Sequence, residues 1–240
     1  MRTRSKEPAN LGKCSKWWEK SFNQSEKKAG GTMEIRTHDL IRVDDISKLV
    51  CLTEVPEWVT GELTDKPFVV VRRAAGLEGR VPVGIRGETR NQRFGCFLPE
   101  EECSIVISPE QLTKEKPWKQ TDRRLSIVAI EVLDRVDELM TSEEMIWGPT
   151  GSVGFELASG LDTAHAGSDL DLIIRCEQPL PMHKAQRLVQ ELSQFPVHID
   201  VQMETGKGAC SLAEYSRGQD SLLLRTVNGP MLVKDPWSEH

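Results

Sequence analysis

The stretch Asp169-Leu170-Asp171-Leu172-Ile173-Ile174 is the most informative part of the chain, and it indicates a strand. Successive side chains of a strand point to opposite faces, so Asp169 and Asp171 share one face while Leu170 and Leu172 share the other. Two neighbouring carboxylates repel each other unless a cation lies between them, and Mg²⁺ prefers oxygen ligands of this kind. Two solvated acids at a sheet edge are the simpler alternative.

A glycine-containing segment precedes this strand. Gly148-Pro149-Thr150-Gly151-Ser152 lies between an expected strand over 145–149 and an expected helix over 152–159. Glycine lets a backbone approach a ligand closely, and the N-terminus of a helix offers N–H groups to an anion such as phosphate. Ser152 either caps the helix or donates a hydrogen bond to a phosphate oxygen.

A third acid lies downstream, in an expected strand over 197–201. Asp200 is flanked there by Ile199 and Val201, and a buried carboxylate needs a partner. If this strand lies beside the strand of Asp169, three carboxylates converge on a metal pair. Otherwise Asp200 is an acid on a solvated face of the sheet.

The remaining pattern predicts an α+β protein. From about residue 141 the chain alternates strand and helix, which implies helices packed on a sheet. The first half is mixed, with strands expected at 68–71 and 81–85, a loop over 108–120 and one long amphipathic helix over 125–139. Pro82 has no N–H group, so we expect its strand at a sheet edge.

Composition and charge exclude some functional classes. The 240 residues are 38% hydrophobic and 28% charged, which is typical of a soluble globular protein, and no apolar run is long enough to span a membrane. Residues 1–32 carry a net charge of +5 and the remainder −11. An acidic body with a short basic segment does not indicate a protein that binds duplex nucleic acid. Residues 1–32 are expected to be a disordered extension, or else a basic arm for an acidic partner.

The six cysteines favour a cytoplasmic location. They form no C-x-x-C pair, and no signal peptide precedes them. We therefore expect reduced thiols rather than a disulfide framework or a zinc ribbon.

The order of these motifs resembles the DNA polymerase β-type nucleotidyltransferase superfamily. Its signature is Gly-Ser, then Asp-x-Asp with apolar residues between and after the acids, then an aspartate on a later strand. The 17 positions from Ser152 to Asp169 exceed the usual spacing. We expect a loop that contains Gly160, Gly167 and Ser168 to absorb the difference.

The flanking residues are similar to those of a narrower family, the malonate decarboxylase holo-acyl-carrier-protein synthases, also called phosphoribosyl-dephospho-CoA transferases. The resemblance covers roughly residues 38–237. It rests on Gly151-Ser152-Val153-Gly154-Phe155-Glu156-Leu157-Ala158-Ser159-Gly160, Ser168-Asp169-Leu170-Asp171-Leu172, Asp200-Val201-Gln202, Asp235-Pro236-Trp237, His38-Asp39-Leu40 and Val81-Pro82-Val83-Gly84-Ile85-Arg86-Gly87. It implies a first-half domain over 33–140 for substrate or partner, and a nucleotidyltransferase-like catalytic domain over 141–240, with helices on a mixed sheet.

The resemblance also implies a reaction. Family members transfer the 2'-(5''-phosphoribosyl)-3'-dephospho-CoA group from its triphosphate precursor to a serine of the apo acyl carrier subunit of malonate decarboxylase, and diphosphate leaves. By this similarity the catalytic Asp-x-Asp of the family falls on Asp169 and Asp171, and we hypothesise that these two acids bind two Mg²⁺ or Mn²⁺ ions. Asp200 completes one metal site, accepts the serine proton, or does both. Gly151 and Ser152 hold phosphates. Two further phosphate candidates, for which surface charge is the default interpretation, are Arg225 and Lys234.

Several interpretations stay open on sequence alone. The alternatives for function are another nucleotidyltransferase with a different acceptor, or a non-catalytic binding module. Six arginines within 22 positions form a solvated surface, a dock for an acidic carrier protein or a clamp on the triphosphate. They are Arg72, Arg73, Arg80, Arg86, Arg90 and Arg93. His165 and His198 lie near the acids in sequence, either as site residues or simply exposed.

Overall fold

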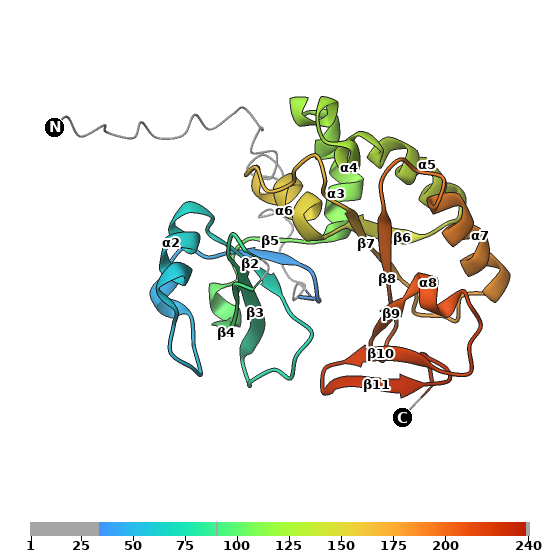
Figure 1. Ribbon diagram of the computed structural model, residues 1–240. Coiled ribbons are helices and arrows are strands. Elements are labelled where there is room, and N and C mark those ends of the chain that lie inside the picture. Colours follow the sequence, from blue (N-terminus) through green and yellow to red (C-terminus); the bar gives the residue numbers. More distant parts are fainter. Residues whose placement is uncertain (1–33, 90, 239–240) are drawn as a thin grey trace, which may run out of the picture.

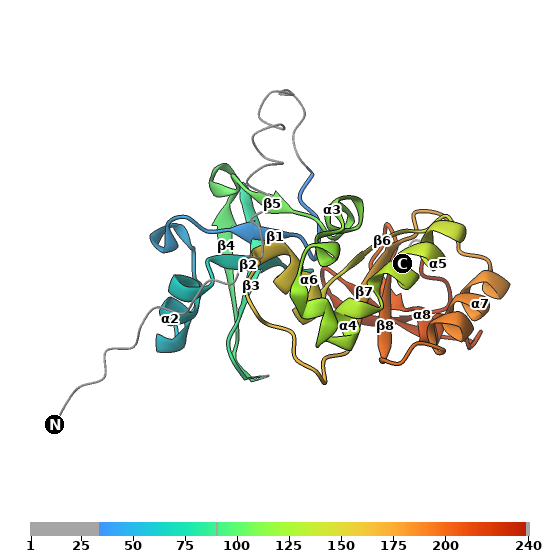
Figure 2. The ribbon, with the colours of Figure 1, turned by 90° about the horizontal axis from the view of Figure 1, so that it is seen from above.

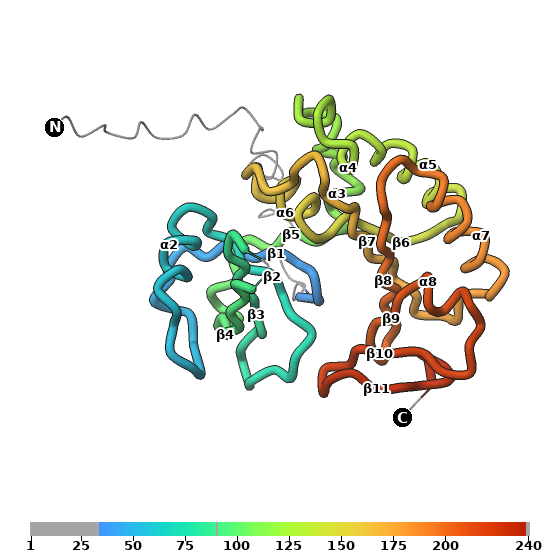
Figure 3. Tube along the Cα trace, viewed as in Figure 1, coloured from blue at the N-terminus to red at the C-terminus, as the bar shows by residue number. Residues whose placement is uncertain are grey.

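The computed structural model describes residues 34–89 and 91–238, and it contains two β-sheets built from consecutive parts of the chain (Figure 1). The path of the chain completes the first sheet before it begins the second (Figure 3). Separate sheets with helices packed around them confirm the predicted α+β class. The predicted extension over 1–32 lies outside the described residues.

The first sheet is antiparallel, with the strand order β4-β3-β2-β1-β5. Helix α2 (Glu57–Asp65) packs on one face, where Val59 and Leu63 join Val69, Val71 and Val83 in a small core. Phe68 points from the other face into the larger core of the second half. The strands are β1 (Leu40–Arg42), β2 (Phe68–Val71), β3 (Arg80–Arg86), β4 (Arg93–Pro99) and β5 (Val106–Ile107).

The second sheet is mixed, with the order β11-β10-β9-β8-β7-β6, and this confirms the predicted mixed sheet. Only β7 and β8 pair in parallel; the other pairs in this sheet are antiparallel. The strands are β6 (Ile146–Pro149), β7 (Leu170–Arg175), β8 (Ile199–Glu204), β9 (Ala209–Ser211), β10 (Leu222–Thr226) and β11 (Gly229–Val233). The helices are α3 (Pro109–Glu115), α4 (Val128–Glu131), α5 (Leu133–Ser142), α6 (Gly151–Ser159), α7 (Met182–Leu192) and α8 (Leu212–Tyr215). Short 3₁₀ helices span Ile46–Lys48, Glu100–Glu102, Pro117–Lys119 and Asp122–Leu125.

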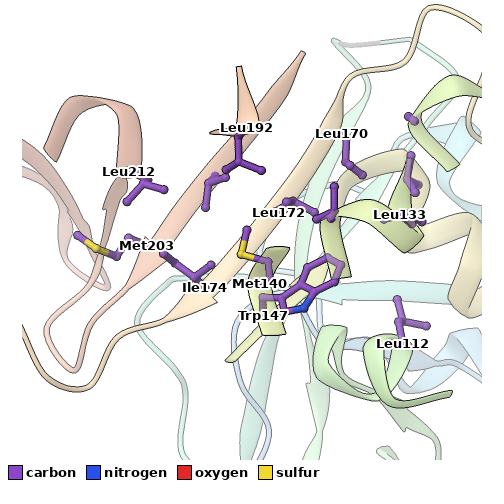
Figure 4. Close-up of a cluster of buried hydrophobic side chains, with 14 of the residues drawn as sticks. Leu112, Leu133, Met140, Trp147, Leu170, Leu172, Ile174, Leu192, Met203 and Leu212 are labelled. Atoms are coloured by element: carbon purple, nitrogen blue, oxygen red, sulfur yellow. The ribbon is translucent and has the colours of Figure 1, made fainter. Parts of the chain in front are cut away.

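One face of the second sheet is apolar and is covered by helices. Leu170, Leu172 and Ile174 alternate along β7 and pack with Met140 of α5 and Leu192 of α7 (Figure 4). Seen from above, α5 and α7 lie at the opposite end of the molecule from α2 (Figure 2). Five of the six alternate residues of β7 and β8 are polar, the exception being the buried Ile173, and this polar face is turned toward the first sheet. No helix in the described part of the chain has the length and apolarity needed to cross a membrane.

Contacts between the sheets follow the polar face from end to end. At one end Phe68 packs edge-on against Phe155 of α6, with ring centroids 6.2 Å apart. In the middle the His38 Nε2 atom lies 2.9 Å from the Gln202 Oε1 atom of β8. At the other end Arg73 forms a two-pronged ion pair with Glu204. The first sheet is therefore held in a defined position over the polar face.

Helices α3, α4 and α5 share the larger core with the second sheet. The domain boundary that we predict after residue 140 assigns α3, α4 and most of α5 to the first half of the chain. Their buried side chains include Leu112, Ile130, Leu133 and Val136, all of which pack in this core.

Two local predictions are wrong. The segment 108–120 contains helix α3 rather than a loop, because Ser108 and Gln111 form a capping box and Pro109 occupies the first helical position. The long helix over 125–139 is two helices, since α4 ends at Glu131 and α5 begins at Leu133. Leu125 is 86% exposed and belongs to neither helix.

The expectation that Pro82 marks an edge strand is also wrong, because β3 pairs with both β2 and β4. The Pro82 carbonyl accepts the N–H of Arg72, which follows the last residue of β2. In an antiparallel strand the amide nitrogen of a residue points to the same side as its carbonyl, so the nitrogen of Pro82 also faces Arg72, just beyond the end of β2. The missing N–H of Pro82 therefore removes no hydrogen bond between β3 and β2.

Candidate active site

Asp171 is at the centre of the carboxylate cluster. It lies on the polar face of β7 and pairs in register with Asp200 of the parallel strand β8. Burial raises the pKa of Asp171, and the nearby charges of Asp200 and Asp169 raise it further. Arg86 and His198 act in the opposite direction. A cation would therefore be favourable here, since it would offset the repulsion among the carboxylates.

The other two acids lie at the same end of the two strands. Asp169 is exposed and directly precedes β7, and Asp200 is exposed as the second residue of β8. The condition set from the sequence, that the Asp200 strand lie beside the Asp169 strand, is met. Adjacent strands lie about 4.8 Å apart, which brings the side chains of Asp171 and Asp200 within reach of a common ligand.

Gly151 brings helix α6 against Asp171. Its φ is +61°, a left-handed conformation that glycine adopts without penalty. A Cβ atom at this position would overlap the Asp171 Oδ2 atom. The Thr150 N–H donates to the Asp171 carbonyl at 2.8 Å and fixes the start of the helix to β7. The first turn of α6 is thus adjacent to the carboxylates.

Ser152 is the second residue of α6, so it is not the helix cap. The cap is Thr150, whose side chain makes no capping hydrogen bond. The Ser152 Oγ atom lies 3.5 Å from the Ser168 Oγ atom, in the loop that leads to Asp169. Its hydroxyl and the N–H groups of the first turn therefore form a polar end suited to an anion.

The loop over 160–168 is held by a buried ion pair. Glu156 is only 3% exposed, and it accepts the Arg123 Nε–H at 2.6 Å and the N–H groups of Thr163 and Ala164 at 2.9 and 2.8 Å. The Thr163 hydroxyl also donates to the Ser152 carbonyl at 2.8 Å. The long spacing between Ser152 and Asp169 is thus taken up by an anchored loop.

Sequence reasoning gave Glu156 and Arg123 no role. The available signal was an acid among Val153, Leu157 and Ala158 on the apolar side of a helix, since a buried charge needs a partner. Nothing in the sequence pointed to Arg123, which lies 33 residues away in a 3₁₀ helix.

The structure does not bring Arg225 and Lys234 to the carboxylates. Arg225 lies in the row of Glu204, two strands from β8. Strand geometry separates it from Asp200 by about 13 Å along the strands and about 10 Å across them. Lys234 follows β11, the outermost strand, about 14 Å across the sheet from β8.

The donor chemistry of the carboxylate cluster fits a hard cation such as Mg²⁺. Asp169, Asp171 and Asp200 offer only oxygen, which Mg²⁺ and Mn²⁺ prefer. Over the described residues, no three His, Cys, Asp or Glu side chains are gathered closely enough to ligate one ion. The fit therefore rests on the type of donor and on the raised pKa of Asp171.

Comparisons with known proteins identify the family. Residues 116–236 match the model for the phosphoribosyl-dephospho-CoA transferase MdcG C-terminal domain, and residues 36–109 match that for its N-terminal domain. This chain belongs to the phosphoribosyl-dephospho-CoA transferase family. It is therefore a transferase, and the alternative of a non-catalytic binding module has no support.

Relatives of known name agree over nearly their whole length. A phosphoribosyl-dephospho-CoA transferase of Pseudomonas putida is 38% identical over 85% of this chain and 95% of its own. One from Azotobacter vinelandii is 35% identical over 77% of this chain and 86% of its own. The family resemblance predicted from the sequence is confirmed. No solved structure is significantly similar to the chain.

Proposed function

We propose that this transferase moves the 2'-(5''-phosphoribosyl)-3'-dephospho-CoA group from its triphosphate precursor to a serine of the apo acyl carrier subunit of malonate decarboxylase. The single observation that carries the chemistry is the pairing of Asp171 with Asp200 beside Gly151. Family membership supports the substrate and the acceptor. We also propose that the catalytic half is related to the DNA polymerase β-type nucleotidyltransferases.

The serine oxygen forms a bond to the phosphorus atom nearest the ribose. The bond between that phosphorus and the oxygen that links it to the second phosphate breaks. Diphosphate leaves with the bond electrons. Such transfer depends mainly on positioning and on charge neutralisation. Mg²⁺ or Mn²⁺ held by Asp169, Asp171 and Asp200 would neutralise phosphate charge.

Other roles fall to groups of the chain itself. Asp200 is exposed on its strand and accepts the proton of the serine hydroxyl. The first turn of α6, with Gly151 and Ser152, binds the phosphates that depart. Arg225 and Lys234 lie too far from Asp200 to share those phosphates, so the proposal gives them no part in the transfer.

We propose the cytoplasm as the compartment. Five described cysteines are free thiols, which suits a reducing environment. Burial raises the pKa of Cys96, Cys176 and Cys210 to about 12, which keeps these thiols protonated and unreactive. We propose no nucleic acid or membrane partner for this transferase.

The test is the intact mass of the apo carrier subunit after incubation with this protein, the precursor and Mg²⁺. We expect a mass gain equal to the phosphoribosyl-dephospho-CoA group. Asp171→Asn should lower the rate at least about a hundredfold, since charge stabilisation at such a site is worth several kcal/mol. Asp65→Asn, on the exposed end of α2, is the control and should keep the wild-type rate.

Two outcomes would contradict the proposal. If the carrier subunit gains no mass after incubation with folded wild-type protein, it is not the acceptor. That result would favour a nucleotidyltransferase that acts on another acceptor. A wild-type transfer rate for Asp171→Asn would show that Asp171 and Asp200 are not the reaction centre.

A further inference from the structure

The structure separates the six clustered arginines into different roles. Arg73 is engaged with Glu204 between the two sheets. Arg80 begins β3, at the end of the strand far from the carboxylates. Arg90 lies outside the described residues. The three that remain project from the same face of the first sheet, and they are Arg72, Arg86 and Arg93.

Arg86 and Arg93 are direct cross-strand partners. They end the pairing of β3 with β4, and both side chains are exposed. Like charges placed directly opposite each other destabilise a sheet. Across the described residues, neither arginine forms a salt bridge with an acid. Electrostatic repulsion between Arg86 and Arg93 therefore destabilises the folded protein, and a bound anion would relieve that repulsion.

A third guanidinium is directed toward this pair by two glycines. Gly84 and Gly95 face each other on β3 and β4, two residues from Arg86 and Arg93 and on the same face. A Cβ atom on Gly84 would lie 2.9 Å from the Arg72 Cδ atom, and one on Gly95 would overlap the Arg72 Nη1 atom. The missing side chains thus leave room for Arg72 to lie flat along the sheet.

This basic cluster lies at the carboxylate end of the contact between the two sheets. Continuing the register of β2 and β3 by two residues puts Arg86 opposite Phe68. The Phe68 ring packs on Phe155 of α6, the helix that begins at Gly151 beside Asp171. The charge of Arg86 is also close enough to oppose the rise in the pKa of Asp171.

We propose that Arg72, Arg86 and Arg93 bind the oligophosphate of the substrate from the side opposite the first turn of α6. Guanidinium groups suit this role because their paired N–H donors match two phosphate oxygens. This inference rests on the proposed function for the identity of the substrate. The three arginines lie on the face of the first sheet that is turned toward the second half and the carboxylates, and this position favours a phosphate over an acidic face of the carrier protein.

The test uses inorganic triphosphate as the probe, without metal, in calorimetric titrations of the full chain. Arg86→Ala and Arg93→Ala should each weaken binding about tenfold, as expected for the loss of one charge-assisted contact. Arg86→Lys should recover part of the loss. Arg80→Ala is the matched control, because Arg80 is exposed on the same strand and face but about 20 Å away, and its binding should equal wild type.

A glycine variant tests the geometry without removing an arginine. Gly95→Ala displaces the Arg72 guanidinium, so it should weaken triphosphate binding about as much as Arg72→Ala. Equal binding by wild type and Gly95→Ala would remove Arg72 from the site.

Steady-state transfer separates the two possible ligands. The KM for the precursor should rise about tenfold in Arg86→Ala while the KM for the carrier stays constant. If Arg86→Ala binds triphosphate as wild type does but has a raised KM for the carrier, the proposal is overturned. The cluster would then be a binding surface for the carrier protein. If wild type binds triphosphate through these arginines but transfers nothing, the phosphate site stands and the proposed function fails.

Discussion

Asp39 is a carboxylic acid held where it has little solvent. It is 2% exposed, and its Oδ2 atom accepts the Arg36 N–H at 2.8 Å. Its Oδ1 atom has no hydrogen-bond partner within the described chain. Burial raises the pKa of Asp39 to about 7, from an ordinary value of 3.8, because the charged form is poorly solvated there. The folded protein therefore holds this proton more tightly than the unfolded chain does.

Asp39→Asn should change the pH dependence of stability. In wild type the contribution of Asp39 is fully present below about pH 4 and is lost as the pH rises to about 7. The slope from this group is at most about 1.4 kcal/mol per pH unit. Between about pH 4 and pH 7, urea unfolding should show a smaller loss of stability for Asp39→Asn than for wild type, because the variant lacks this titrating group. Parallel profiles for Asp39→Asn and wild type would contradict the raised pKa.

At the scale of elements, the approach of α6 to β7 decides the geometry of the site. Gly151 begins the helix, and its lack of a side chain lets the first turn contact Asp171. The anchored loop over 160–168 then returns the chain to Asp169 through Glu156 and Arg123. A helix and a strand separated by ten residues are thus joined by a loop that is anchored to the helix.

Gly151→Ala should impair transfer more than stability. The added Cβ atom forces Asp171 or the helix start to move, and a shift of about 1 Å can cost a hundredfold in rate. Gly160→Ala is the matched control, since Gly160 also has a positive φ, +74°, but lies at the other end of α6. Both variants should lose about 1 kcal/mol of stability from backbone strain. Equal transfer rates for the two variants would argue against the contact of Gly151 with Asp171.

At the scale of the whole molecule, an ion network joins the two sheets. Arg73 and Glu204 are 13% and 9% exposed at their side chains. Arg175 adds a contact of 3.7 Å to Glu204 and one of 2.6 Å to Glu110 of α3. These groups lie on the polar face of the second sheet, where few water molecules can replace a lost partner.

Arg73→Ala should destabilise the protein by about 3 kcal/mol, because it leaves Glu204 buried with a weaker partner. Urea unfolding measures the loss. Lys48→Ala, which removes a solvent-exposed ion pair with Glu102, should change stability little. An Arg73→Ala protein as stable as wild type would show that the ion pair between Arg73 and Glu204 does not contribute to holding the two sheets together.

Short-range patterns were sufficient for much of the fold. Apolar runs and alternation predicted β2, β3 and β7 correctly, because a strand face is decided by residues two positions apart. The prediction of a loop over 108–120 failed although its capping box was present in the sequence. The edge position of Pro82 failed for a different reason, since the length of the neighbouring strand β2 cannot be read from Pro82 itself.

The sequence by itself determined the α+β class, the family and the Gly-Ser, Asp-x-Asp and later Asp motifs, because each depends on local order or on similarity along the chain. The tertiary structure alone decided which charges meet. Strand register paired Asp171 with Asp200, and the packing of one sheet on the other assigned Arg73 to an ion pair and left the charge of Arg86 close enough to lower the pKa of Asp171. Electrostatic interactions depend on distance in space, and a chain that folds into two sheets brings together residues that its sequence keeps far apart.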